Sequence, residues 1–414
     1  MAEDYLPIPG THVFRALHEQ NCIVMATNVR IFPGIGKGIF RAAKDMDAAI
    51  ILEIAKSESD LAGGYTGMTP ATYAQFCMEA AKAVKHDIWV LHADHITIKK
   101  GDQPEIDSVK KHVDAQIDSG FTSFAIDASH LFDFKGKDLR EEMSLNIDAT
   151  TKIAKHILGR MGKEPFGLEV EVGEIGKEDQ HGRVLTRPEE AVVFIEALHE
   201  NGIDPDVLAI ANGSAHGNTY DAQGNMVEQV SIDIPQTMSV AKALKDKGWR
   251  VRIAQHGITG TPRDLIATKF PKGDIIKGNV ATFYQNMVYD LLKVYNPSLY
   301  QDIWNWTMKK YAEKNKGKAP NEIFGTNVKN AAKQYYKELY NQPEDFVKAC
   351  ELMSYAETTV WLKAFNNVGT AKRVREYLKT VPKVTTRRVP TLGTGNVTPQ
   401  ANQGPSHEPG KYDD

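Results

Sequence analysis

Three histidines in this sequence come at or just after the end of a short apolar run, where a side chain can do chemistry rather than pack. The first stands in LHADHITIKK, in which Asp94 and His95 close a run that begins IWV. The other two are His216 in NGSAHG and His256 in QHG. Three imidazoles that met at one place would suit Zn²⁺ with an open coordination position. A lone histidine of this kind is more often a hydrogen-bonded structural residue, so the hypothesis depends on all three.

Carboxylates accompany these histidines in neighbouring apolar runs. Asp127 closes SFAIDAS, and Glu169 and Glu171 lie two residues apart in GLEVEVGEI, on one face of an extended strand. Next to imidazole ligands, carboxylates orient the rings or hold a second metal ion. The competing interpretation is that Asp127 caps the following helix and that the glutamates face solvent. His92, one layer deeper than Asp94 on the same face, is interpreted as a buried structural histidine.

Two turns rich in glycine and threonine follow the last runs of the pattern. HGITGT (256–261) leads into a helix at TPRDLI, and GNVAT (278–282) ends in a hydroxyl. Backbone amides and threonine hydroxyls at the start of a helix form a cradle for a phosphate group. Glycines also occur where a turn is merely tight. The two turns therefore indicate a phosphate site only in combination with the histidines. The combination predicts a metal Lewis acid that faces a phosphorylated small molecule.

The elements that must position these residues are eight short runs rich in β-branched residues. They cover residues 22–28, 48–55, 88–94, 123–129, 167–175, 206–213, 251–257 and 274–282. Helix-like segments such as RPEEAVVFIEALHENG alternate with them, with Pro near the start and Gly after the end. Eight strand–helix units predict a TIM (β/α)8 barrel. An open doubly wound sheet is the competing fold, but no GxGxxG follows the first run.

A barrel would bring the candidate residues together, because the carboxyl ends of all its strands share one rim, where barrel enzymes have their active sites. Asn28 ends the first run, and Lys277 and Asn279 belong to the last one. The turns after the seventh and eighth strands are also the usual place of a phosphate site in barrels. The barrel is expected over residues 1–290. A helical extension is expected over 291–380 and a disordered tail, rich in Pro, Gly, Asn and Gln, over 381–414.

Bulk properties restrict the partners and the compartment. A formal net charge of −3 gives no reason to expect nucleic acid or a membrane as a partner. The three cysteines, Cys22, Cys77 and Cys350, are far apart, which argues against a disulfide framework or a thiolate zinc site and fits a reducing cytosol. The N-terminus has no signal-peptide pattern, and no apolar run reaches 18 residues. A soluble, cytoplasmic protein is expected.

Taken together, the motifs resemble those of the class II, metal-dependent fructose-bisphosphate and tagatose-bisphosphate aldolases. The resemblance runs from about Asn28 to Gln285, and its motifs fall in order: HADH (92–95), SFAIDAS, GLEVEVG, AHG (215–217), QHGITG (255–260) and KGNVAT (277–282). Several ordered motifs are far more specific than any single one.

The resemblance implies a role for each candidate residue. His95, His216 and His256 would bind Zn²⁺, and Asp127 and Glu171 would form a second position for a divalent or monovalent cation, or support the first. Asp94 would assist proton transfer, and Glu178, or alternatively Asp179, would protonate the carbon from the mobile loop after the fifth strand. The substrate and its phosphate would be contacted by Asn28, Ser57, Gly217, Gly257, Thr259, Lys277, Asn279, Ala281 and Thr282.

The chain departs from the family pattern in three places. Ala55 stands where the family has a serine, with Ser57 nearby, and Ala281 stands where fructose-bisphosphate members often carry an acid. Tagatose-type members also carry alanine there, so the stereochemistry of the sugar stays open. Residues 296–322 resemble an insertion, which leaves Arg373 or Arg375 as candidates for the arginine that family members send across a dimer interface to the far phosphate.

The activity implied by the resemblance is reversible cleavage of a ketose (bis)phosphate, with fructose 1,6-bisphosphate as the default, to dihydroxyacetone phosphate and glyceraldehyde 3-phosphate. Such an enzyme would act as a homodimer or homotetramer in glycolysis and gluconeogenesis. A tagatose-bisphosphate aldolase is the alternative within the family. The rivals outside it are a Schiff-base aldolase that uses Lys277 and a non-catalytic barrel that binds a sugar phosphate.

Overall fold

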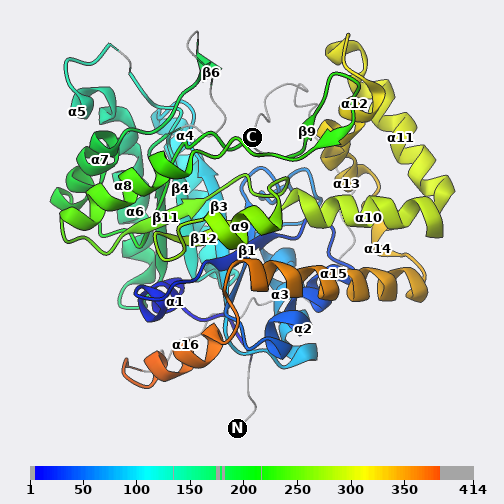
Figure 1. The fold of residues 1–414 in the computed structure, drawn as a ribbon, viewed down its shortest axis with the longest axis horizontal. Helices are drawn as coiled ribbons and strands as arrows, with labels where there is room; N and C mark the ends of the chain where they lie inside the picture. The colour runs from blue at the N-terminus through cyan, green and yellow to red at the C-terminus, as the bar shows by residue number, and fades with distance from the viewer. Residues whose placement is uncertain (1–4, 134, 174–177, 180–181, 216, 383–414) are drawn as a thin grey trace.

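The centre of the molecule is a closed barrel of parallel strands in the order β1-β12-β11-β8-β5-β4-β3-β2 (Figure 1). This computed structural model describes residues 5–133, 135–173, 178–179, 182–215 and 217–382. The barrel strands are β1 (Val24–Asn28), β2 (Ile50–Ala55), β3 (Trp89–Thr97), β4 (Ser123–Asp127), β5 (Gly167–Glu171), β8 (Val207–Ala209), β11 (Arg252–Gln255) and β12 (Ile275–Asn279). Each overlaps one of the eight predicted runs, so the predicted TIM barrel is confirmed.

Helices surround the barrel, and all but the last one, α10, connect consecutive barrel strands. They are α2 (Ile35–Asp45), α3 (Pro70–Val84), α4 (Gln103–Asp118), α5 (Leu139–Glu142), α6 (Ser144–Met161), α7 (Pro188–Glu200), α8 (Ile234–Asp246), α9 (Arg263–Lys269) and α10 (Thr282–Tyr295). Local chemistry sets several of their starts. Thr69 and Asp102 accept hydrogen bonds from the backbone amides of Thr72 and Glu105, and thereby cap α3 and α4. Pro188 occupies the first position of α7, where no hydrogen-bond donor is needed.

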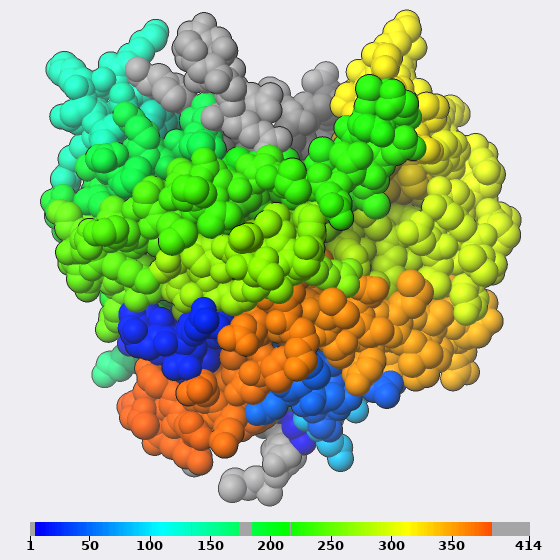
Figure 2. All heavy atoms as spheres, in the orientation of Figure 1, coloured from blue at the N-terminus to red at the C-terminus, as the bar shows by residue number. Residues whose placement is uncertain are grey.

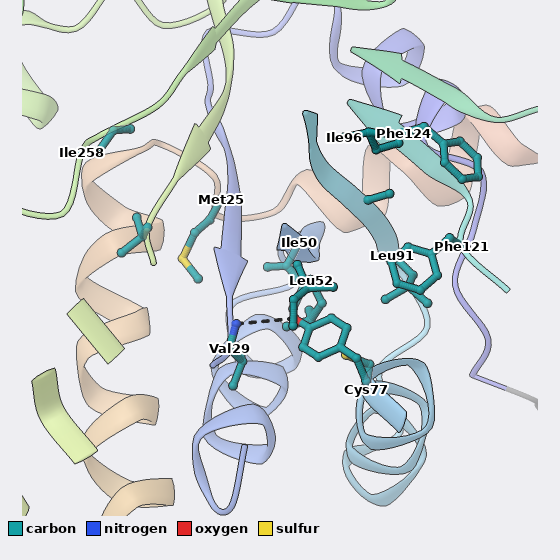
Figure 3. Packing of buried hydrophobic residues seen from close by; sticks show 14 of the residues in the cluster. Met25, Val29, Ile50, Leu52, Cys77, Leu91, Ile96, Phe121, Phe124 and Ile258 are labelled. Atoms are coloured by element: carbon teal, nitrogen blue, oxygen red, sulfur yellow. Dashed lines mark hydrogen bonds between the residues drawn. The ribbon is translucent and has the colours of Figure 1, made fainter. Parts of the chain in front are cut away.

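Two apolar cores hold the barrel together. The larger lies between the strands and the helices, and Figure 3 shows Leu52 of β2 near Cys77 of α3. The smaller fills the barrel interior at its lower end, where Val13 and Phe14 of α1 (Gly10–Leu17) pack with strand residues. The sequence patterns did not predict α1. Helix α1 therefore covers the lower end of the barrel.

The residues after the barrel form further helices that share its core. These are α11 (Pro297–Tyr311), η1 (Glu313–Asn315), α12 (Pro320–Asn327), η2 (Val328–Asn330), α13 (Ala331–Gln334), α14 (Tyr336–Tyr340), α15 (Glu344–Ala364) and α16 (Thr370–Leu378). Helix α15 packs on α2, α9 and α10, and α16 packs on α1. Figure 2 shows these segments, yellow to orange, covering one side of the molecule. The extension therefore shares a hydrophobic core with the barrel, and Phe346 and Phe365 lie inside that larger core.

Two small ribbons that the sequence patterns did not predict rise from the rim. The segment after β5 forms β6 (Glu178–Asp179) and β7 (Gly182–Arg183), and the segment after β8 forms β9 (Thr219–Tyr220) and β10 (Met226–Val227). In Figure 1, β6, β9 and α12 lie at the upper end and α1 at the lower end. The predicted tail (381–414) falls outside the described residues except for its first two. Among the described residues, no helix is both long enough and apolar enough to cross a bilayer.

The close approach of α15 to α2 allows a test of how the extension packs on the barrel helices. A Cβ on Gly38 would overlap the carbonyl oxygen of Glu351 and the side chain of Ser354, whereas Gly159 on α6 has no atom within 4 Å of its would-be Cβ. We expect Gly38→Ala to destabilise the protein by about 1–3 kcal/mol, because the backbone of α15 must shift. Gly159→Ala should instead stabilise by about 0.5–1 kcal/mol. Thermal unfolding measures both, and equal effects of the two substitutions would contradict the packing described.

Candidate active site

A bulge in β3 places two adjacent side chains in one pocket. The pairing of β3 with β4 shifts register between Ala93 and Ile96, and His95 between them has φ of +38°. In a regular strand, neighbours such as Asp94 and His95 point to opposite faces, and a bulge removes that alternation. A positive φ costs a histidine about 1–3 kcal/mol and persists only where surrounding contacts hold it. The contacts of the His95 side chain, described next, stabilise this backbone conformation.

The imidazoles of His95 and His256 face each other across the rim. His95 Nε2 lies 2.8 Å from His256 Nδ1. On its far side, His95 Nδ1 lies 2.9 Å from Glu171 Oε1 and 3.6 Å from Asp127 Oδ2. The far nitrogen of His256, Nε2, lies 2.8 Å from Glu169 Oε1. Each ring is therefore held by a carboxylate from behind and turns its other nitrogen toward the shared space.

This donor set fits a transition-metal ion. The nearest donor atoms of Asp94, His95 and His256 lie within 4.8 Å of one another, and a second group joins His95 to Asp127 and Glu171. Imidazoles backed by carboxylates are the usual arrangement of metal-binding histidines, because the carboxylate fixes the ring and raises its basicity. The predicted third histidine, His216, lies outside the described residues.

Asp94 is held by two amides at the floor of the site. Asn28 Nδ2 donates to Asp94 Oδ2 at 3.0 Å, and Asn279 Nδ2 donates to Asp94 Oδ1 at 3.4 Å. Burial alone would raise the pKa of Asp94, but the nearby His95, Lys277 and His256 hold it below its ordinary value. Asn279 Oδ1 is buried without a hydrogen-bond partner among the described residues, which leaves an acceptor for a hydroxyl. The group thus presents a carboxylate and an amide oxygen to a ligand.

Beneath this layer, the ammonium of Lys277 is fully enclosed by carboxylates. Its Nζ lies 2.9 Å from Glu53 Oε2 and 2.8 Å from Glu169 Oε2, and 3.8 Å from Asp94 Oδ1. Burial lowers the pKa of Lys277, but Glu169, Glu53 and Asp94 outweigh it and raise the pKa above its ordinary value. As predicted, His92 beside it is buried and hydrogen-bonded, with Nδ1 2.7 Å from Ser123 Oγ. Lys277 is fully buried and does not line the pocket described below, and its predicted contact with the substrate stays a prediction.

The site opens into a solvent-connected pocket at the rim. The predicted residues that line it are Asn28, Asp94, His95, Gly217, His256, Gly257, Thr259, Asn279, Ala281 and Thr282. Asp127 and Glu171 stand behind His95 rather than on the surface of the pocket. Ser57 is not part of the lining; from the same turn, Ala55 and Glu58 are. Glu178 and Asp179 form β6 after β5, and their side chains fall outside the described ones.

Several lining residues escaped the sequence analysis. They are Arg30, Glu58, Asn218, Gln285, Gly325, Thr326 and Lys329. A signal existed for Arg30, which follows Asn28 by two residues at the end of β1. No local pattern pointed to Lys329, because it reaches the pocket from the extension. Arg375 instead pairs with Asp87 and Asp47, which precede β3 and β2 at the lower end of the barrel.

The enclosure of Lys277 predicts a large effect on stability. Lys277→Met would leave Glu53 and Glu169 buried without their cation, so we expect a loss of about 3–5 kcal/mol in the free energy of unfolding. Lys293→Met is the matched control, because Lys293 is half exposed and pairs with Asp290 at the surface. That control should change stability by less than about 1 kcal/mol. Urea unfolding compares the two, and similar losses would refute the central role of Lys277.

Comparisons with known proteins agree with this geometry. The family model described as fructose-bisphosphate aldolase class-II matches residues 9–346. Fructose-bisphosphate aldolases of Giardia intestinalis and Thermus caldophilus are each 28% identical, over 233 and 232 residues, or 55% and 56% of this chain. The alignments cover 58% and 62% of those relatives, so the chain matches less than two thirds of their length.

A solved structure shows the same fold. The crystal structure of the Campylobacter jejuni fructose-bisphosphate aldolase superposes with a TM-score of 0.54, covers 87% of this chain and 95% of that chain, and is 19% identical. At that identity the likeness concerns the fold alone. The family model, by contrast, covers most of the chain, from α1 to the start of α15. The chain belongs to the class II fructose-bisphosphate aldolase family.

Proposed function

We propose that the protein is a zinc-dependent aldolase that reversibly cleaves a ketose phosphate to dihydroxyacetone phosphate and an aldehyde. The observation that carries the proposal is the pair of facing imidazoles, each backed by a carboxylate, with Asp94 beside them in a pocket at the barrel rim. Zinc would be held by His95 and His256, with His216 as the expected third ligand. Asp127 and Glu171 would support His95 or hold a second cation.

The chemistry needs two proton transfers besides a cation. When bound, zinc would stabilise the negative charge that develops on the carbonyl oxygen as the carbon–carbon bond breaks. Asp94, kept ionised by its neighbours, would accept the proton of the C4 hydroxyl, and Asn28 and Asn279 would fix its orientation. Glu178, with Asp179 as the alternative, would protonate the carbon from the segment after β5.

The substrate would be anchored by its phosphate. Gly217, Gly257, Thr259 and Thr282 all line the pocket, and small residues with hydroxyls suit a phosphate group. We propose fructose 1,6-bisphosphate as the substrate. Tagatose 1,6-bisphosphate is the alternative, because Ala281 replaces the acid common in fructose-bisphosphate members. Homodimers or homotetramers and a cytoplasmic location stay predictions.

The burial of Lys277 argues against a Schiff-base mechanism. A lysine nucleophile must lose its proton and reach the carbonyl carbon of the substrate. Lys277 is fully buried and has a raised pKa, with two carboxylates within 3 Å. The family to which the chain belongs is likewise the metal-dependent one.

Removal of the metal is the direct test. We expect a chelator to abolish cleavage of fructose 1,6-bisphosphate and Zn²⁺ to restore it, measured by coupling triose phosphate formation to NADH oxidation. His256→Ala should lose the tightly bound zinc. His156→Ala is the control, because His156 pairs with Asp114 between α6 and α4, outside the barrel. Activity that survives the chelator, or borohydride trapping of the substrate on the protein, would refute the metal mechanism.

Asp94 should affect the rate rather than the metal content. Asp94→Asn keeps the size of the side chain but removes the proton acceptor, so we expect kcat to fall by about 10²–10⁴-fold. Zinc stoichiometry, measured by elemental analysis, should stay near that of the unsubstituted protein because both imidazoles remain. A variant with nearly full kcat would show that another group accepts the proton.

A further inference from the structure

The extension forms part of the wall of the pocket. Gly325 and Thr326 of α12 and Lys329 of η2 line it together with barrel residues. Gly325 lies directly on Tyr220 of β9, since a Cβ at this position would overlap the tyrosine hydroxyl. The absence of a side chain at Gly325 therefore lets the extension close against the segment that follows β8.

Hydrogen bonds fix this wall to the barrel on two further sides. Lys333 of α13 donates from its backbone amide to Tyr65 O at 3.0 Å and from Nζ to Ala62 O at 2.9 Å. Tyr289 of α10 donates from its hydroxyl to Val328 O at 3.2 Å. The turn that carries Lys329 is thus held between the segment after β2 and the helix after β12, so its position relative to the rim is set by the fold.

Few lining residues carry a positive charge. The residues proposed to cradle the phosphate offer amides and hydroxyls but no formal charge, and a phosphate dianion is bound most strongly by charge-assisted hydrogen bonds. The lysine and arginine side chains of the described lining are Arg30 and Lys329. Both stand beside one ring: Arg30 Cζ lies 5.8 Å and Lys329 Nζ 5.5 Å from the centroid of Tyr65.

Arg30 connects this pair to the cradle. Its Nη1 donates to Thr282 Oγ1 at 3.1 Å, and its Nε donates to Glu58 Oε1 at 2.6 Å. Glu58 also accepts hydrogen bonds from Tyr65 and Asn28. The carboxylate of Glu58 therefore fixes the guanidinium next to a cradle hydroxyl and offsets much of its charge.

We propose that Lys329, together with Arg30, binds the substrate phosphate that occupies the cradle after β11 and β12, so that the extension completes the anion site within a single chain. The identity of the substrate rests on the proposed function, whereas the binding of a phosphate ester does not. Lys329 is the specificity element, because it comes from the extension and the charge of Arg30 is already paired with Glu58.

Calorimetry on the full, zinc-loaded chain tests the inference without turnover. The probes are hexitol 1-phosphate and hexitol 1,6-bisphosphate, which lack the carbonyl and are not cleaved. We expect Lys329→Met to weaken binding of both by about tenfold, the size of one lost charge-assisted contact, and Lys329→Arg to recover most of it. Lys316→Met is the control, because Lys316 lies on the same extension with its side chain 81% exposed, and it should bind both probes as the unsubstituted chain does.

The outcomes separate this inference from the proposed function. Weakening confined to the bisphosphate would place Lys329 at the far phosphate and overturn its assignment to the cradle. Affinities equal to those of the Lys316→Met control would remove Lys329 from the site altogether. If the unsubstituted chain bound the probes but cleaved no ketose phosphate, the proposed aldolase activity would be refuted. The proposed anion site would still be supported.

Discussion

The rim of this barrel depends on one buried cation. The ammonium of Lys277 lies within 3 Å of carboxylate oxygens of Glu53 and Glu169, all fully enclosed. Moving such carboxylates out of water costs several kcal/mol for each ion unless a cation and hydrogen bonds compensate. Glu169 in turn holds His256 by its other oxygen. The positive charge of Lys277 therefore affects the site through Glu169. It keeps Glu169 ionised and in place behind His256.

The order of the strands and the polar residues at their ends could be predicted from the sequence, because both follow from local alternation of apolar runs and helices. How deep each polar side chain lies inside the barrel could not be predicted from the sequence. Lys277 stands two residues before Asn279 on the same strand face, yet only Asn279 lines the pocket. The bulge at His95 was equally invisible, since strict alternation would have turned Asp94 or His95 away from the site.

The contribution of the extension depends on contacts between residues far apart in the chain. The sequence predicted a helical extension over residues 291–380, but not the surface on which it packs. Lys333 reaches the segment after β2 across more than half the chain, and Gly325 fits against Tyr220 only because of its missing side chain. No local pattern encodes such a pairing. The barrel supplies the facing imidazoles and most of the pocket lining, and the later helices close the wall around them.

The two facing imidazoles also show why the site calls for a cation. Glu171 and Glu169 are acceptors, so each ring must donate a hydrogen from the nitrogen that faces its carboxylate. That choice turns the lone pairs of His95 Nε2 and His256 Nδ1 toward each other, at 2.8 Å. Two lone pairs repel at this distance unless a positive charge lies between them, either a shared proton or a metal ion. A zinc ion, which binds imidazole nitrogens at about 2.0–2.1 Å, would need the rings to move apart only slightly. The carboxylates behind the rings therefore aim both inner nitrogens at the one position that a proton or a metal ion would occupy.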